Sequence, residues 1–300
     1  MGRSDGQGKI HRAAEVTLGG IALARAGRRA WRRLRTPSLQ GQTVLITDGS
    51  RGLGLALARE LAREGAAQLV LCARDAGDLD RAAAELRGPE LDVLTVPCDV
   101  GRDEDVARLV DATLAHCGRV DILVNNAGVI SVGPVETQRP QDFAEAMNIM
   151  FFGALRPTLA VLPHMKERRR GHIAFITSIG GKVSVPHLLP HACARFAAVG
   201  LAEGLRAEVA RFGITVTTVT SPVTSINADH AARRIVRAVR GGEAEIILRP
   251  RARALAAFHG LFPTRSFLTR LGQRAAERFR QLPPGEDRRT GNRETGRRGG

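Results

Sequence analysis

Short apolar runs alternate with longer amphipathic stretches from residue 43 to residue 248, and this alternation limits the fold more than any other feature of the chain. The apolar runs predict buried strands at 43–47, 69–73, 93–96, 122–124, 173–177, 215–219 and 245–248. The intervening stretches predict helices at 53–64, 78–87, 103–117, 142–165, 191–212 and 228–240. Such alternation is typical of a parallel sheet covered on both faces, because a parallel pair needs a crossover connection. The sequence therefore predicts an α/β fold with a Rossmann-like, doubly wound parallel sheet in three α/β/α layers.

The chain length of 300 residues suits one such domain with extensions at both ends. We expect a basic N-terminal arm at 1–39 and the α/β domain at 40–250. Amphipathic helices are expected at 251–282, followed by a charged, Gly-rich and disordered tail at 283–300.

The net charge of +15 lies in the two ends of the chain. Residues 1–39 carry +7 and residues 249–300 carry +9, so the domain between them is close to neutral. No nucleic-acid motif or aromatic platform accompanies the arginines, which makes nucleic acid a disfavoured partner. The arm around Trp31 could make a weak contact with an anionic membrane surface, although a solvated or docked helix is the favoured interpretation.

The four cysteines are scattered without a C-x-x-C pair, which favours a reduced, cytoplasmic compartment, with peripheral membrane contact as the alternative. His187, His191 and Cys193 could be imagined as metal ligands. Pro190 separates the two histidines and places the first in a loop, so we expect no metal site.

A Gly-rich turn follows the first predicted strand and opens the first predicted helix. This arrangement lets backbone N–H groups and a helix N-terminus approach a pyrophosphate closely. The candidate cofactor-binding residues of the turn are Thr47, Gly49, Ser50, Arg51, Gly52, Leu53 and Gly54.

Three further motifs accompany this turn: Cys98-Asp99-Val100, Asn125-Asn126-Ala127-Gly128, and Ser178 placed thirteen residues before His191. Together they resemble the short-chain dehydrogenase/reductase family over roughly residues 40–250. The resemblance implies hydride transfer between a nicotinamide dinucleotide and a small carbonyl or alcohol substrate. It also implies that helices 142–165 and 191–212 pair subunits in a homodimer or tetramer. The site residues it implies are Asp99 at the adenine ring, Val100, Asn125, Ala127 and Gly128 around the cofactor, and Ser178 at the substrate carbonyl.

Two arginines and one aspartate bear on the choice of cofactor. Arg51 and Arg74 resemble the basic residues that accept an adenosine 2′-phosphate, and Ala73 stands where an acid would bind a free ribose diol. NADP(H) is therefore expected over NAD(H). Asp48 replaces the first glycine of the family's turn, and a carboxylate about 5 Å from a phosphate would repel it by roughly 3 kcal/mol at an effective dielectric constant near 20. We expect this repulsion to weaken cofactor binding.

The catalytic positions depart from the family pattern. The chain has no tyrosine, and His191 and Arg195 occupy the Tyr-x-x-x-Lys positions. A histidine with an ordinary pKa near ~6.5 could donate a proton, whereas Arg195 could hold a ribose but could not exchange a proton near neutral pH. Met150 replaces the asparagine of the proton relay, so only Ser178 of the catalytic set remains.

These departures leave three hypotheses open. The favoured one is a catalytically impaired family member that binds NADP(H), or has lost even that binding, and acts through contacts with partners or with copies of itself. The second is a working carbonyl reductase or alcohol dehydrogenase with His191 as acid, Ser178 as substrate orienter and Arg195 on the ribose. The third is a membrane-surface or nucleic-acid adaptor that acts through the Arg-rich ends. The short connection from Ser221 to Ala228, too brief for the usual substrate lid, also favours impairment.

Overall fold

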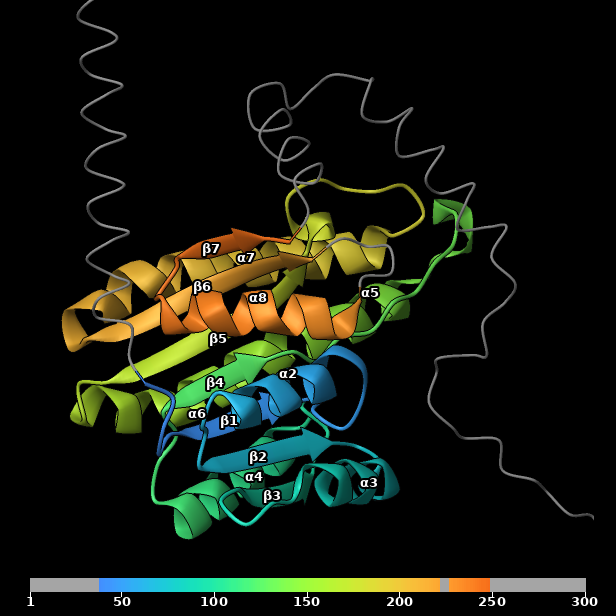
Figure 1. The fold of residues 1–300 in the computed structure, drawn as a ribbon. Coiled ribbons are helices and arrows are strands. Elements are labelled where there is room, and N and C mark those ends of the chain that lie inside the picture. The colour runs from blue at the N-terminus through green and yellow to red at the C-terminus, as the bar shows by residue number, and fades with distance from the viewer. Residues whose placement is uncertain (1–37, 222–226, 249–300) are drawn as a thin grey trace, which may run out of the picture.

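The computed structural model describes residues 38–221 and 227–248, and these form one parallel sheet with helices on both faces (Figure 1). Seven strands follow the order β3-β2-β1-β4-β5-β6-β7, and every neighbouring pair is parallel. Their bounds are β1 Thr43–Thr47, β2 Gln68–Ala73, β3 Asp92–Pro97, β4 Ile122–Asn125, β5 Gly171–Ser178, β6 Ile214–Ser221 and β7 Glu245–Ile247. The predicted Rossmann-like, doubly wound fold is confirmed.

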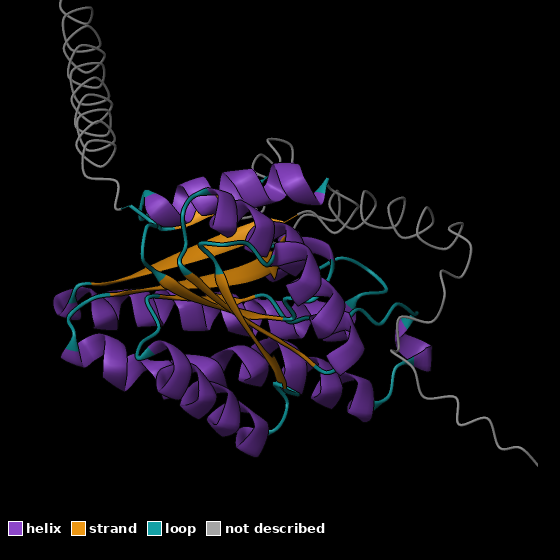
Figure 2. Cartoon of the chain, turned by 60° about the horizontal axis from the view of Figure 1, so that its bottom comes forward, coloured by secondary structure: helices purple, strands orange, loops and turns teal. Residues whose placement is uncertain are grey.

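Two helical layers enclose the sheet (Figure 2). One layer contains α2 (Gly52–Arg63), α3 (Ala76–Leu86) and α8 (Ala228–Arg240). The opposite layer contains α4 (Asp103–Cys117), α6 (Gly153–Glu167) and α7 (Leu189–Val209). The helix α5 (Pro140–Met147) packs against α7 beyond the sheet edge.

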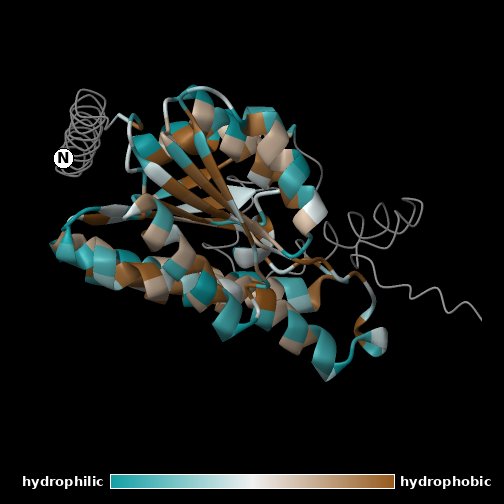
Figure 3. Cartoon of the chain, turned by 90° about the horizontal axis from the view of Figure 1, so that it is seen from below, coloured by the Kyte–Doolittle hydropathy of each residue, from teal (hydrophilic) through white to brown (hydrophobic). Residues whose placement is uncertain are grey.

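The alternation of side chains along the strands produces these two cores. In β1, Val44 and Ile46 join the core under α2 and α8, whereas Leu45 joins the core under α4 and α6. Successive side chains point to opposite faces of a strand, and a sheet buried on both faces therefore needs apolar residues at every position. The brown strands in Figure 3 lie between helices that show teal on their outer surfaces.

One predicted helix is wrong in detail. Residues 142–165 form α5 and α6 separated by a π-helical turn, η2 (Asn148–Phe152), rather than one regular helix. A π-turn adds a residue to the local ring of hydrogen bonds, so it rotates Met150 relative to a regular helix. The combined run Pro140–Glu167, with mean hydropathy 1.3, is the one candidate for crossing a membrane among the described residues by length and composition. It is nevertheless a core element here, because α6 packs on α4 and β4.

Several predicted segments lie wholly or mostly outside the described residues. They comprise residues 1–37 of the predicted basic arm 1–39, the connection 222–226, the predicted helices 251–282 and the predicted tail 283–300. The cytoplasmic location and the contact of the arm with an anionic membrane stay predictions from the sequence.

Candidate active site

The predicted site residues gather at the carboxyl ends of the strands. The chain leaves β1 toward β2 on one side and reaches β4 on the other, so a crevice opens between the ends of β1 and β4. Ligands of doubly wound sheets bind at such a reversal of strand order. The Gly-rich turn follows β1, and the Asn125-to-Gly128 segment begins at the end of β4.

The Gly-rich turn keeps a tight backbone although aspartate replaces its first glycine. Asp48 adopts a left-handed conformation with φ of 51°, which aspartate tolerates better than most residues. Asn126 Nδ2 donates hydrogen bonds to the carbonyl oxygens of Thr47 (3.2 Å) and Asp48 (3.0 Å). Gly54 must lack a side chain because a Cβ there would overlap the Asp48 carbonyl oxygen. The aspartate is therefore accommodated without loss of the turn.

The N-terminus of α2 offers a phosphate cradle. The helix begins at Gly52, with φ of +54° and open space where a Cβ would stand. Arg51 precedes it in an extended conformation and provides no side-chain cap. The first N–H groups of a helix have no intrahelical acceptors, so they can donate to a pyrophosphate. The turn therefore fits the dinucleotide that the sequence predicts.

The carboxyl group of Asp48 belongs to the turn that forms this cradle. It is half-buried, and the charges that act on it are those of Arg51, Arg74 and Asp78. Burial raises the pKa of Asp48, and the two arginines only partly oppose that effect. The repulsion between Asp48 and a phosphate is therefore expected on the side of the site where Arg51 and Arg74 lie.

Asp99 and Val100 follow the end of β3. Asp99 Oδ1 accepts a hydrogen bond from Gly101 N at 2.8 Å, and the Asp99 N–H donates to Asp105 Oδ2 at 2.9 Å. Val100 is buried in the core under α4 and α6. These bonds fix the loop that would border an adenine ring.

The Thr47 hydroxyl ties β1 to the segment after β4. Its oxygen accepts from Asn126 N at 2.9 Å and from Ala127 N at 3.1 Å. Asn125 Nδ2 donates to Thr158 Oγ1 at 3.0 Å, while the buried Asn125 Oδ1 has no partner among the described residues. Asn126 thus holds the Gly-rich turn, and Asn125 supports strand β4.

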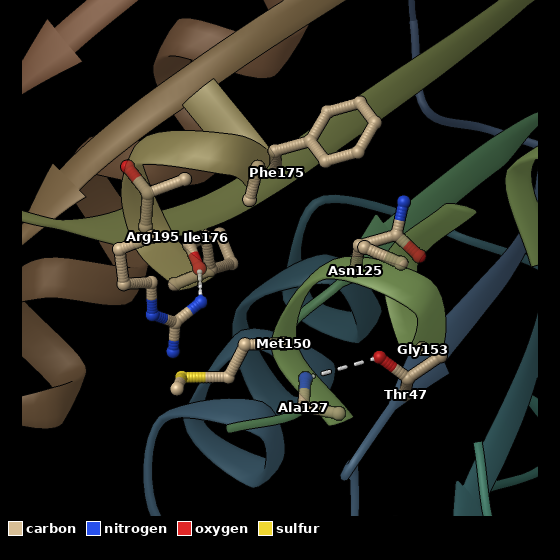
Figure 4. A pocket seen from close by; sticks show the side chains of 11 residues that line it. Thr47, Asn125, Ala127, Met150, Gly153, Phe175, Ile176 and Arg195 are labelled. Carbon is tan, nitrogen blue, oxygen red and sulfur yellow. Dashed lines mark hydrogen bonds between the residues drawn. The ribbon is translucent and has the colours of Figure 1, made fainter. Parts of the chain in front are cut away.

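A small cavity of about 10 Å³ lies between β1, β4, β5, η2 and α7, which is room for about one water molecule (Figure 4). Arg195 lines it and donates from Nη1 to the Ile176 carbonyl at 2.7 Å. Its Nη2 lies against Gly128, where a Cβ would overlap it, and its buried Nε has no partner among the described residues. Burial lowers the pKa of Arg195 to about 10, so it remains a cation at neutral pH. The lining residues are Thr47, Asn125, Ala127, Met150, Gly153, Ala154, Phe175, Ile176, Thr177, Arg195 and Ala198.

Ser178 and His191 border one space that Gly180 leaves open. The point where a Cβ on Gly180 would stand is 3.7 Å from Ser178 Oγ and 3.5 Å from His191 Nε2. Both side chains are buried, and Ser178 Oγ accepts from Gly180 N at 3.2 Å. The sequence prediction that these two residues share a site is consistent with this geometry.

The surroundings of His191 determine which proton it can carry. Its Nδ1 lies 3.3 Å from the Val129 carbonyl, which only accepts, so Nδ1 carries the hydrogen. Nε2 is then unprotonated in the neutral ring, and it is buried without a partner among the described residues. Burial, assisted by the positive charge of Arg195, lowers the pKa of His191 to about 4. The ordinary histidine pKa assumed from the sequence therefore does not apply.

Comparison with known proteins gives the family. A family model described as short chain dehydrogenase matches residues 42–234. This chain belongs to that family. Retinol dehydrogenase 8 of Bos taurus is 39% identical over 183 residues, covering 59% of this chain and 57% of that protein. A dehydrogenase/reductase SDR family protein 7-like of Drosophila melanogaster is 33% identical, covering 66% of this chain and 63% of that protein. The match thus spans roughly three fifths of the length of these relatives.

A solved structure agrees with this assignment. A metagenomic short-chain oxidoreductase in complex with NADP superposes with a TM-score of 0.66 and 29% identity, covering 71% of this chain and 99% of that one. The chain is therefore an oxidoreductase-family protein with a nucleotide-binding fold, and the cofactor of the family is NAD(P)(H).

Among the described residues, no neighbouring group replaces the asparagine, tyrosine and lysine that the family resemblance implies for this site. Met150 is buried and lines the cavity beside Arg195. Asn148, at the start of η2, donates from Nδ2 to the Gly101 carbonyl at 3.2 Å. Lys182, in the loop after β5, is held by Glu203 at 3.1 Å and Glu245 at 3.2 Å.

Three participating residues are absent from the predicted site residues, although Asn126 stands within one of the predicted motifs. Asn126 holds the Asp48 carbonyl, Val129 fixes the His191 ring, and Gly180 opens the space between Ser178 and His191. The Gly180-Gly181 pair directly after Ser178 is a signal that could have indicated that space. The carbonyl of Val129 could not be found in this way, because its role depends on a contact across 62 residues.

Proposed function

We propose that this chain binds NADP(H) in the family's cradle and has low or no activity in the family's hydride transfer between NADP(H) and a carbonyl or alcohol. The observation that carries the proposal is the imidazole of His191 at the position of the family's acid: its buried, unprotonated Nε2 has no partner among the described residues and lies, like Ser178 Oγ, beside Gly180. A pKa of about 4 leaves about one protonated ring in a thousand at neutral pH.

Proton transfer is difficult in either direction of the reaction. Reduction needs a donor to the carbonyl oxygen, and a ring protonated only on Nδ1 offers none from Nε2. Oxidation needs a base, and an imidazole with so low a pKa is a weak one. Arg195 could bind a ribose hydroxyl when NADP(H) supplies the hydride, but its Nη1 is already bonded to the Ile176 carbonyl.

The test combines binding with turnover. Calorimetric titration with NADPH, and with NADH in parallel, should show binding that favours NADPH. Turnover of a panel of aldehydes and ketones should be near background in the wild-type protein. It should rise at least tenfold in a variant that carries His191→Tyr, Arg195→Lys and Met150→Asn, because a general acid contributes typically 10²–10⁴-fold.

A matched control identifies the origin of any gained activity. Ser178→Ala, added to the triple variant, should remove the gain because the hydroxyl would no longer orient the substrate carbonyl. Wild-type turnover that disappears in His191→Ala would instead show that His191 is a working acid and would refute the impairment. Absence of binding by either dinucleotide would refute the cofactor assignment.

We also propose that the chain forms a homodimer or tetramer through α6 and α7. Three large apolar side chains are exposed on this side: Phe152 at the end of η2, Leu159 on α6 and Phe196 on α7. Exposed apolar side chains in one region of a surface are typical of protein interfaces. Light scattering coupled to gel filtration measures the mass directly.

A further inference from the structure

Asp48 lies near enough to Arg51 and Arg74, the two arginines that are expected to accept a 2′-phosphate, for both charges to act on its carboxyl group. Thr47 pairs with Cys72, and Gly49 N donates to the Cys72 carbonyl at 3.1 Å. This register places Asp48 level with Ala73, the residue before Arg74. The other arginine, Arg51, follows three residues later in the turn.

The backbone fixes Asp48 in this position. Its left-handed φ of 51° and the hydrogen bond from Asn126 Nδ2 to its carbonyl hold the main chain on one side. Gly54 packs so closely against the same carbonyl that the turn cannot shift toward α2. The carboxyl group is therefore a fixed part of the site, and a bound ligand must adapt to its charge.

The groups that face this carboxyl group come from four elements. They are Arg51 in the turn, Arg74 after β2, Asp78 in the first turn of α3 and the buried Cys72 thiol on β2. The arginines stay charged, and the pKa of the Cys72 thiol is raised well above its ordinary value by its contact with Cys98 and by burial. The aspartates are thus the groups that can change charge when an anion enters.

We propose, on the basis of the proposed NADP(H) binding, that Asp48 takes up a proton when the 2′-phosphate enters, so that binding of NADP(H), unlike binding of NAD(H), depends on this residue's protonation. An ionised carboxylate would compete with the phosphate for Arg51 and Arg74 and repel it. A neutral carboxyl group removes the repulsion and can donate a hydrogen bond to a phosphate oxygen. A ribose diol needs no such change, because the ionised carboxylate accepts its hydroxyl hydrogens. Burial already raises the pKa of Asp48 before any ligand is present.

The experiment measures proton uptake rather than activity. The full-length protein is titrated with NADPH and with NADH at about pH 7.5, in two buffers of different ionisation enthalpy, and the difference in heat gives the protons taken up. The wild-type protein should take up more protons, by a measurable fraction of one per site, with NADPH than the Asp48→Asn variant does. The titration of the phosphate itself is common to both proteins and cancels. Two controls remove a carboxylate from α3 and should leave the uptake unchanged: Asp78→Asn, which faces Asp48, and Asp80→Asn, which is exposed.

Affinity gives a second readout. At high pH, Asp48→Asn should bind NADPH about tenfold more tightly than the wild type does. This gain is smaller than the roughly hundredfold loss of affinity that an unscreened charge at about 5 Å would cause at an effective dielectric constant near 20. It should bind NADH no more tightly than the wild type.

Each remaining outcome decides the proposal. Equal proton uptake by wild type and Asp48→Asn, with NADPH bound by both, would overturn the role of Asp48 and leave the proposed function standing. Loss of the uptake in Asp78→Asn alone would overturn it as well, because another carboxyl group would then take the proton. If no dinucleotide binds to any of these proteins, the proposed function fails and this inference fails with it.

Discussion

Lowering the pH from neutral to about 5 should destabilise this protein through His172, which lies far from the candidate active site at the start of β5. The ring is buried between two hydroxyl groups, with Nδ1 2.6 Å from Thr215 Oγ1 and Nε2 3.0 Å from Thr217 Oγ1. No acidic partner compensates its charge within the described residues, and burial lowers its pKa from 6.5 to about 4.

The size of the effect follows from this shift. A histidine whose pKa falls on folding contributes stability that is complete above pH 6.5 and is lost as the pH falls toward 4. At about 1.36 kcal/mol per pKa unit, the full loss is about 3 kcal/mol, of which about 2 kcal/mol has occurred by pH 5. His191, with a pKa also lowered to about 4, should add a similar amount. The two rings together therefore remove a large part of a typical domain stability.

Urea unfolding followed by circular dichroism, at about pH 7.5 and about pH 5, measures this loss. His172→Gln retains an amide that can bond to the threonine hydroxyls but cannot take up a proton, so about 2 kcal/mol of the acid-induced loss should disappear. His116→Gln, which changes an exposed histidine on α4, should retain the full loss. The same pH dependence in wild type and His172→Gln would refute the assignment of a buried neutral ring.

Three further predictions concern other parts of the fold. Gly54→Ala should abolish NADPH binding and lower the melting temperature, because the added Cβ would overlap the Asp48 carbonyl. Gly52→Ala should cost only about 1–2 kcal/mol of stability in thermal unfolding, because its Cβ would enter open space and only the left-handed φ is strained. Asp121→Asn should destabilise by about 3 kcal/mol in urea, because the buried carboxylate accepts from the backbone N–H of β1 and from two arginines; a loss below about 0.5 kcal/mol would contradict this. Leu159→Glu should lower the mass seen by light scattering to that of a monomer, and an unchanged oligomer would exclude this face.

Much of the fold could be predicted from the sequence, because apolar periodicity directly reflects burial. The predicted bounds agree with the structure for β1, α4 and α8 and differ by one to three residues elsewhere. The π-turn at Asn148–Phe152 could not be predicted, since its residues have the apolar pattern of an ordinary buried helix. Its position depends on how Met150 and Gly153 pack against α7 and Val100 in three dimensions.

The residues of the candidate site were easier to predict than their chemistry. The sequence spacing is enough to predict where Ser178, His191 and Arg195 lie, because the regular geometry of helices and strands fixes the positions of residues at a given spacing. The low pKa of His191 depends on burial and on the charge of Arg195. The environment of Asp48 depends on burial and on Arg74, which follows a different strand. Contacts of this kind between distant elements can be inferred from a sequence only when a relative with the same residues is known.

The two halves of the site respond differently to substitution because they are made of different groups. The phosphate cradle consists of backbone N–H groups at the start of α2, and any residue that tolerates a left-handed φ, such as Asp48, preserves their direction. Proton transfer instead requires one side chain with a suitable pKa and an unobstructed hydrogen. The family resemblance implies a phenol at the position of the buried His191, and such an exchange would alter both properties at once. Binding should therefore survive changes that stop catalysis, and a chain of this kind can lose turnover while its dinucleotide site stays intact.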